Sequence, residues 1–221
     1  MLVEFDSIKR VQKAGVVAVV RGYSEENAYQ VAKACIKGKV TAIELAFTSP
    51  NADTTINKLC KEYHDDPRVI IGAGTVLDAA TARIAIITGA KFIVSPSFNK
   101  ETAKLCNLYE VPYIPGCFSP TEVQTAMKYG ADVIKVFPAS VAGKKVIKEM
   151  HGPFPNINIM PTGGINLKNM REWFENGAFV VGVGGSLVGP GDKDDYQAVT
   201  ENAKQFHKEY LDIINKKEVE L

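Results

Sequence analysis

Histidine is scarce in this sequence, and its scarcity bears on metal chemistry. The 221 residues include three histidines, His64, His151 and His207, which are widely separated along the chain. Neither an H-x-H nor an H-E-x-x-H pattern occurs, although such patterns hold zinc in many metalloenzymes. We therefore expect no metal site and no cofactor.

Cysteine pairs, long apolar runs and excess charge are also lacking. The four cysteines, Cys35, Cys60, Cys106 and Cys117, form no C-x-x-C pair, which indicates reduced thiols in a cytoplasmic protein. No apolar run reaches the length of a membrane helix, and MLVEFDSIKR at the N-terminus lacks a signal-peptide pattern. The net charge is +1, so neither nucleic acid nor a membrane is expected as a partner.

What the sequence does contain is a regular alternation of strand-like and helix-like runs. The strand-like runs are apolar on both faces, which is typical of parallel strands covered by helices. Eight strand–helix units of roughly 20–25 residues predict an α/β fold, a (β/α)8 TIM barrel forming a single domain over residues 1–221. An open doubly wound sheet is the alternative, but it commonly has fewer strands. After an extra N-terminal helix at 4–14, strands are expected at 16–22, 41–47, 69–75, 91–96, 112–116, 132–138, 158–163 and 179–185.

Capping signals mark the expected helix boundaries. Ser49 before Pro50 predicts one helix start. Ser119 and Glu122, around Pro120, form the pattern of a capping box at another. The polar tail at 215–221 is expected to fray. Glycines are expected to end helices at positions 38, 89, 130 and 177.

Two charged residues lie inside apolar strand runs, Glu44 in TAIELAF and Lys135 in DVIKVFP. Charged side chains rarely enter a dry interior, so the two either form a buried ion pair or take part in a reaction. Burial disfavours the charged form of a lysine, and a neutral amine can attack a ketone to form a Schiff base. With Glu44 carrying protons, the pair has the parts of an imine-forming lyase that needs no metal.

Glycine-rich segments follow the last two predicted strands, as PTGGIN (161–166) and VGVGGSLVG (181–189). In TIM barrels a phosphate group often binds in these loops, against backbone N–H groups. Phosphate binding is therefore expected there, with simple tight turns as the alternative. The residues placed for this role are Gly163, Gly164, Gly185 and Ser186.

Two further residues, Thr75 and Arg21, end the third and first predicted strands. The Thr75 hydroxyl and the Arg21 guanidinium are candidates to hold a substrate carboxylate. Thr75 can equally satisfy a turn, and Arg21 can be a charge on the rim of the barrel.

Taken together, the motifs resemble the 2-keto-3-deoxy-6-phosphogluconate (KDPG) aldolases, which also cleave 4-hydroxy-2-oxoglutarate. The resemblance covers nearly the whole chain, and the order of the motifs makes it specific. The motifs are IELAFT (43–48), IGAGTV (71–76), FIVSP (92–96), IPG (114–116), IKVFPA (134–139), GPFPN (152–156), PTGGIN (161–166) and VGGS (183–186).

The resemblance implies a class I aldolase on a (β/α)8 barrel, usually a homotrimer, in the Entner–Doudoroff pathway of carbohydrate metabolism. The implied substrate is a small 2-keto acid phosphate, cleaved to pyruvate and glyceraldehyde 3-phosphate. Lys135 matches the Schiff-base lysine, Glu44 the general acid/base and Thr75 a carboxylate contact. The glycines and Ser186 named above fall where the family binds phosphate, and the substrate site is also expected to include Pro96, Phe137 and Thr162.

One position departs from part of the family. Some members carry an arginine four residues after the glutamate, where this chain has Thr48. Arg21 is therefore a candidate for the carboxylate contact. The alternatives that stay open are cleavage of 4-hydroxy-2-oxoglutarate to pyruvate and glyoxylate, a 6-phosphogalactonate aldolase, a phosphosugar isomerase or epimerase, and a non-catalytic phosphate-binding barrel.

Overall fold

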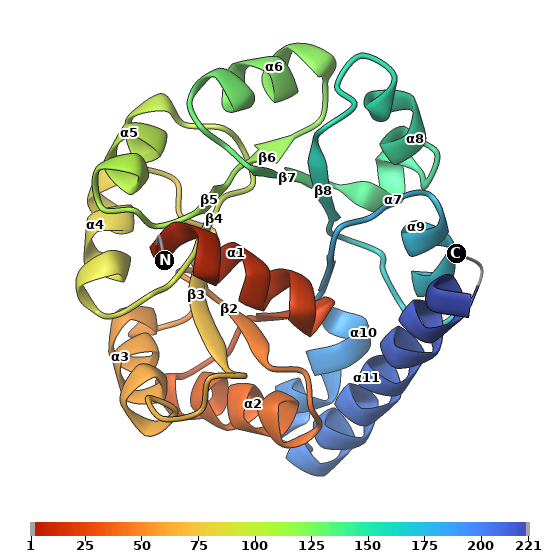
Figure 1. Ribbon diagram of the computed structural model, residues 1–221. Coiled ribbons are helices and arrows are strands. Elements are labelled where there is room, and N and C mark those ends of the chain that lie inside the picture. The colour runs from red at the N-terminus through yellow and green to blue at the C-terminus, as the bar shows by residue number, and fades with distance from the viewer. Residues whose placement is uncertain (1–2, 220–221) are drawn as a thin grey trace.

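The first helix lies across the middle of the molecule, and the following helices surround the strands in a ring that the chain follows toward its C-terminus (Figure 1). The structure is a computed structural model that describes residues 3–219, so positions 1–2 and 220–221 of the predicted domain lie outside the described residues. The strands are β1 Val16–Val20, β2 Ala42–Ala46, β3 Ile70–Gly74, β4 Ile93–Val94, β5 Tyr113–Ile114, β6 Gly116–Cys117, β7 Val133–Val136, β8 Asn158–Pro161 and β9 Val181–Val183.

Most of the helices lie between consecutive strands. The last one, α11, remains helical through position 219, so the part of the predicted fraying tail that the structure describes is helical. The helices are α1 Val3–Ala14, α2 Glu25–Lys37, α3 Ala52–Glu62, α4 Ala79–Ile87, α5 Lys100–Leu108, α6 Pro120–Lys128, α7 Ala139–Ala142, α8 Val146–His151, α9 Met170–Glu175, α10 Gly185–Val188, the 3-10 helix η1 Gly189–Lys193, and α11 Tyr196–Val219. None of the helices within residues 3–219 is long and apolar enough to cross a membrane.

All of the strand pairings are parallel, and the sheet is curled. One sheet has the order β5-β4-β3-β2-β1-β9 and the other β6-β7-β8. Every residue of β1, β2 and β3 is buried, which confirms the prediction of parallel strands covered on both faces. The two sheets approach each other at an isolated parallel bridge between Thr162 and Gly182.

The fifth predicted strand, 112–116, is divided at Pro115 into β5 and β6. Proline has no N–H to donate to a neighbouring strand. Its carbonyl still accepts a hydrogen bond from the N–H of Lys135 at 2.9 Å. The chain therefore passes from the first sheet to the second at Pro115, and this places Lys135 beside the junction.

A layer of apolar side chains fills the amino-terminal end of the curled sheet. Residues two apart on a strand share a face, and this layer is formed by the early inward positions of the strands. Val11 of α1 belongs to the same cluster, so α1 covers this end of the strands. The side chains of the layer that lie on strands, or directly before β4 and β9, include Val17, Ala42, Ile70, Phe92, Ile114, Val133, Met160 and Val180.

The structure confirms one predicted helix cap and corrects another. Ser119 and Glu122 form the reciprocal capping box at the start of α6. At α3, however, the helix begins at Ala52 behind Asn51, and Ser49 is not its cap. The Ser49 side chain is instead buried and accepts a hydrogen bond from the N–H of Gly22 at 2.9 Å. It thus ties the loop after β2 to the loop after β1.

Three of the four predicted helix-ending glycines, Gly89, Gly130 and Gly177, have a positive φ. Gly38 does not, since its φ is −82°. A Cβ at Gly38 would lie 2.4 Å from the Cβ of Ala203, so glycine is needed here for the close approach of α11. The left-handed residue at this helix end is Lys39, with φ +75°.

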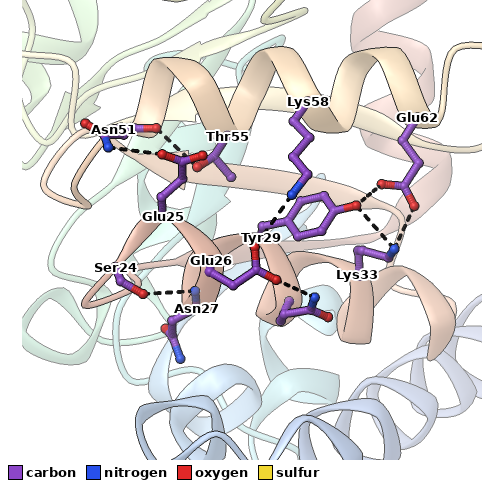
Figure 2. Close-up of polar contacts among 11 residues, drawn as sticks. Ser24, Glu25, Glu26, Asn27, Tyr29, Lys33, Asn51, Thr55, Lys58 and Glu62 are labelled. Atoms are coloured by element: carbon purple, nitrogen blue, oxygen red, sulfur yellow. Dashed lines mark hydrogen bonds and ion pairs between the residues drawn. The ribbon is translucent and has the colours of Figure 1, made fainter.

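Helices α2 and α3 are joined on their outer side by polar side chains (Figure 2). The Tyr29 hydroxyl donates a hydrogen bond to Glu62, and Lys33 forms an ion pair with the same carboxylate at 2.8 Å. Lys58 lies over the Tyr29 ring, 3.5 Å from its centroid. These contacts fix two neighbouring helices that cover β2, the strand carrying Glu44.

Candidate active site

The structure brings the two charged strand residues together, as the sequence predicted. Glu44 on β2 and Lys135 on β7 form an ion pair, with 3.6 Å between the lysine Nζ and the Oε1 of the glutamate. Their side chains are 0 % and 5 % exposed, respectively. The Lys135 ammonium also lies 5.2 Å from the ring centroid of Phe137. The pair is therefore held in a dry interior with an aromatic wall.

Glycine at the neighbouring strand position makes room for the glutamate. A Cβ at Gly74 of β3 would lie 2.1 Å from Oε1 of Glu44, and this contact is too close for any larger residue. Similarly, a Cβ at Gly182 would lie 2.2 Å from Oγ1 of Thr162. The inward glycines thus create the space that the polar side chains occupy.

Three buried oxygens in this interior have unused hydrogen-bonding capacity. Neither carboxylate oxygen of Glu44, nor the hydroxyl oxygen of Thr162, has a hydrogen-bond partner among residues 3–219. Leaving a buried polar group unpaired costs about 1–3 kcal/mol. Such groups in a cleft are characteristic of sites that bind and transform a polar ligand.

Next to the pair, a cavity of about 390 Å³ opens at the carboxyl ends of the strands. It contains seven of the residues predicted to bind substrate, from Arg21 to Ser186. One of them is Phe137, whose ring faces the Lys135 ammonium, although Lys135 and Glu44 are not themselves among the lining residues. The predicted binding residues did not include Val19, Ile165, Asn166 and Gly184, although the alternation of β1 marks Val19 as sharing the face of Val17. The cavity is lined by Val19, Arg21, Phe137, Thr162, Gly163, Gly164, Ile165, Asn166, Gly184, Gly185 and Ser186.

Backbone groups dominate the glycine-rich side of this cavity. Gly163 and Gly164 have φ values of +100° and +79°, which are accessible to glycine at little cost. The Ser186 hydroxyl donates a hydrogen bond to the carbonyl of Ile165 at 2.6 Å. Gly185 and Ser186 stand in the first turn of α10, where the N–H groups have no partner within the helix. An anion in the cavity would meet these N–H groups.

Arg21 and Thr48 are neighbours in space. The guanidinium of Arg21 donates a hydrogen bond to Oγ1 of Thr48 at 3.1 Å. Arg21 directly follows β1 and Thr48 lies in the loop after β2, so this contact joins the carboxyl ends of two neighbouring strands. This contact was not foreseen, because only the fold brings the two strand ends together.

Thr75 and Pro96 are the two residues predicted to bind substrate that do not line the 390 Å³ cavity. Thr75 is half-buried with φ +55°, so its backbone is left-handed. A Cβ at Gly116 would lie 2.1 Å from the carbonyl oxygen of Pro96, which shows how tightly that loop packs beside β6. The Tyr113 hydroxyl lies 2.7 Å from Oγ of the buried Ser95 and stabilises the same loop.

Metal-ligating side chains do not gather anywhere in the part of the chain that the structure describes: no three His, Cys, Asp or Glu residues are placed to hold a metal ion. His151 contacts the carbonyl of Ile157 at 3.0 Å. The four cysteines are free thiols. Burial raises the pKa of Cys117, which neighbours the site on β6, to about 12.

An α/β fold with a curled parallel sheet, and a lysine and a carboxylate buried beside a glycine-lined cavity, define an enzyme of the aldolase class. Residues 7–202 match the model of the KDPG and KHG aldolase family, and the chain belongs to this family. It is an aldolase and therefore a lyase, which confirms the resemblance seen in the sequence.

Individual relatives agree with this assignment. The 2-dehydro-3-deoxy-phosphogluconate aldolase of Treponema pallidum is 34% identical, over 93% of this chain and 96% of its own length. The 2-dehydro-3-deoxy-6-phosphogalactonate aldolase of Escherichia coli is 29% identical, over 91% and 97%. A solved KDPG aldolase of Legionella pneumophila, with pyruvate captured at low pH as a covalent carbinolamine intermediate, superimposes with a TM-score of 0.82 at 28% identity, covering 90% of this chain and 96% of that one.

Proposed function

We propose that this protein cleaves KDPG to pyruvate and glyceraldehyde 3-phosphate through a Schiff base on Lys135. The observation that carries the proposal is the buried pair of Lys135 and Glu44, 3.6 Å apart, beside a glycine-lined cavity. The Treponema pallidum relative supports this substrate. The Escherichia coli relative supports 6-phosphogalactonate chemistry as the second candidate, which differs in the configuration of one hydroxyl group. Cleavage of 4-hydroxy-2-oxoglutarate to pyruvate and glyoxylate would use the same chemistry.

The proposed reaction passes through an imine and then an enamine, both formed on Lys135. Glu44 first accepts a proton from the Lys135 ammonium, and the neutral amine attacks the C2 ketone. Glu44 then returns the proton to the C2 hydroxyl, which leaves as water and gives a protonated imine. Glu44, through a water molecule, removes the proton from the C4 hydroxyl, and the electrons of the C3–C4 bond move into the imine. Glyceraldehyde 3-phosphate departs and leaves an enamine on Lys135. Protonation at C3 and hydrolysis of the imine then release pyruvate and the free lysine.

The substrate lies with its phosphate in the 390 Å³ cavity and its carboxylate toward the first and third strands. Backbone N–H groups of the two glycine-rich loops bind the phosphate, as anions bind at helix N-termini. Arg21 and Thr75 bind the carboxylate, the arginine by a charge-assisted hydrogen bond. Pro96, Phe137 and Thr162 shape the walls around the reacting carbons. The phosphate-binding residues are Gly163, Gly164, Gly185 and Ser186.

The same proposal extends to the architecture and the setting of the enzyme. A closed (β/α)8 barrel is supported by the Thr162–Gly182 bridge and by the continuity of β5 and β6 through Pro115. A homotrimer is supported by the family resemblance and by exposed apolar side chains on the outer helices, including Ile84 and Ile87. Free thiols support a cytoplasmic location, and the chemistry suits the Entner–Doudoroff pathway.

Trapping of the imine tests the mechanism. The protein is incubated with pyruvate and sodium borohydride, digested, and analysed by mass spectrometry, and we expect a reduced adduct on the peptide containing Lys135. Lys135→Met should abolish the adduct, whereas Lys168→Met, which removes an exposed lysine near the same cavity, should retain it. An adduct that survives Lys135→Met would refute the proposed mechanism. Comparing kcat/KM for KDPG and its galactonate isomer identifies the substrate.

A further inference from the structure

A second cavity, of about 530 Å³, lies at the opposite end of the strands from the glycine-lined cavity. Thr41 and Arg68, which precede β2 and β3, line it together with residues of α1, of the α2–β2 connection and of α11. The aldolase mechanism uses none of these residues. The volume is within the range of small-molecule sites, roughly 300–1,000 Å³.

Positive charge is concentrated in this second cavity, although the whole chain has a net charge of only +1. Its single lining carboxylate, Asp66, is already bound by Arg68, whose Nε and Nη2 donate hydrogen bonds to it at 2.9 and 2.7 Å. Arg68 lowers the pKa of Asp66 to about 2. The cationic lining residues are Arg10, Lys13, Lys37, Lys39 and Arg68.

Arg10 is fixed in position but keeps a free donor. Its Nη2 donates a hydrogen bond to the carbonyl of Val69 at 2.6 Å, and its Nη1 lies 3.8 Å from a carboxylate oxygen of Asp6. The Nε atom is buried and has no hydrogen-bond partner within the described part of the chain. An anion in the cavity could accept this hydrogen bond, because a guanidinium offers five N–H donors.

Lys39 lines the cavity, and its own backbone conformation is strained. It occupies the left-handed position after α2, with φ +75°, where glycine is usual. Its N–H donates to the carbonyl of Ile36 at 2.9 Å, and the N–H of Val40 to that of Cys35 at 3.0 Å, so the turn itself would suit glycine. Lysine at a position that favours glycine places a cation in the cavity in spite of the backbone strain.

From these observations we propose that the second cavity binds a small organic anion carrying two or more phosphate groups, of the nucleoside polyphosphate type. The lysines and arginines bind the phosphate oxygens by charge-assisted hydrogen bonds. The organic part packs against the apolar portion of the lining, formed by Ala14, Ile36 and Pro67. This site is separate from the substrate site, so its occupancy does not depend on which 2-keto acid the enzyme cleaves.

Isothermal titration calorimetry with ATP and with inorganic tripolyphosphate tests the proposal. We expect saturable binding that weakens with added salt, and tighter binding of ATP than of tripolyphosphate because the organic part packs on the apolar portion. Equal affinities for the two ligands would overturn the nucleoside polyphosphate assignment. Lys39→Gly should weaken binding about fivefold or more, since a charge-assisted contact is lost. The same variant should be at least as stable as the original, because glycine relieves the strain, so misfolding cannot explain a lost affinity. Lys128→Gln, an equal loss of charge on the exposed surface of α6, should leave binding unchanged.

His207 lines the same cavity and reports where the anion binds. Burial and the nearby Lys39 lower the pKa of its imidazole. An anion beside Lys39 should raise that pKa in NMR titrations, whereas an anion in the glycine-lined cavity should not affect it. His64 and His151 are internal controls. Unchanged affinity in Lys39→Gly, or a His207 resonance insensitive to saturating ATP, would overturn the proposal.

Discussion

Removing Lys135 alone should destabilise the folded protein considerably. At 3.6 Å, the attraction between Lys135 and Glu44 is about 5 kcal/mol for an effective dielectric constant of about 20. Lys135→Met leaves the Glu44 carboxylate buried without a counter-charge, a change that typically costs about 3–5 kcal/mol. For a chain of this size, such a loss corresponds to a decrease in Tm of about 6–20 °C. Adding Glu44→Gln should recover much of the loss, since no buried charge then remains.

Urea and thermal denaturation of the two single variants and the double variant measure this coupling directly. The control is Lys204→Met, which breaks an exposed pair with Glu201 on α11 at 2.7 Å. That variant should change the free energy of unfolding by only about 0.3–0.5 kcal/mol. If Lys135→Met is no more destabilising than Lys204→Met, the Lys135–Glu44 pair is effectively solvated, and the description of a dry interior is wrong.

Three further predictions concern the neighbouring glycine, the thiols and metal ions. Gly74→Ala forces a methyl group against the Glu44 carboxylate, so kcat should decrease at least about tenfold; unchanged kcat would contradict the proposed role of Glu44. Burial raises the pKa of Cys35 and Cys106 to about 12, above the unfolded value of about 8.5. Their contribution to stability is full below pH 8.5 and lost as the pH rises toward 12. Tm should therefore fall between pH 8.5 and 11 in thermal scans, and a double Cys→Ala variant should show a smaller fall. Dialysis against EDTA should leave aldolase activity intact, and activity restored only by added metal would contradict the Schiff-base mechanism.

The regular parts of the fold were predictable because local patterns determine them. Apolar runs gave the strands, and the capping box at Ser119 gave the start of α6. The division of the fifth strand at Pro115 and the role of Ser49 were not predictable in the same way. Both depend on contacts between segments far apart in the sequence, such as the hydrogen bond from Gly22 to Ser49.

The candidate site follows a similar division. Lys135 and Glu44 were identifiable because a charge inside an apolar strand is unusual. The contact between Arg21 and Thr48 could not be foreseen, since it joins side chains from two different strand ends. The cavity around Lys39 could not be foreseen either, because its lining residues include residues of α1, of the α2–β2 connection and of α11. Sequence patterns reveal unusual residues on one element, whereas sites assembled from several elements require the tertiary structure.

The position of α1 across the amino ends of the strands has a consequence for the order of the reaction. That end of the interior is filled by the apolar layer and covered by α1, so substrate is proposed to enter, and products to leave, at the carboxyl ends of the strands. In the proposed mechanism the pyruvate portion stays covalently bound to Lys135 after the C3–C4 bond breaks, whereas the aldehyde is free to leave. Release is therefore ordered, with aldehyde first and pyruvate second. In the direction of synthesis, pyruvate has to form its enamine on Lys135 before the aldehyde partner can react.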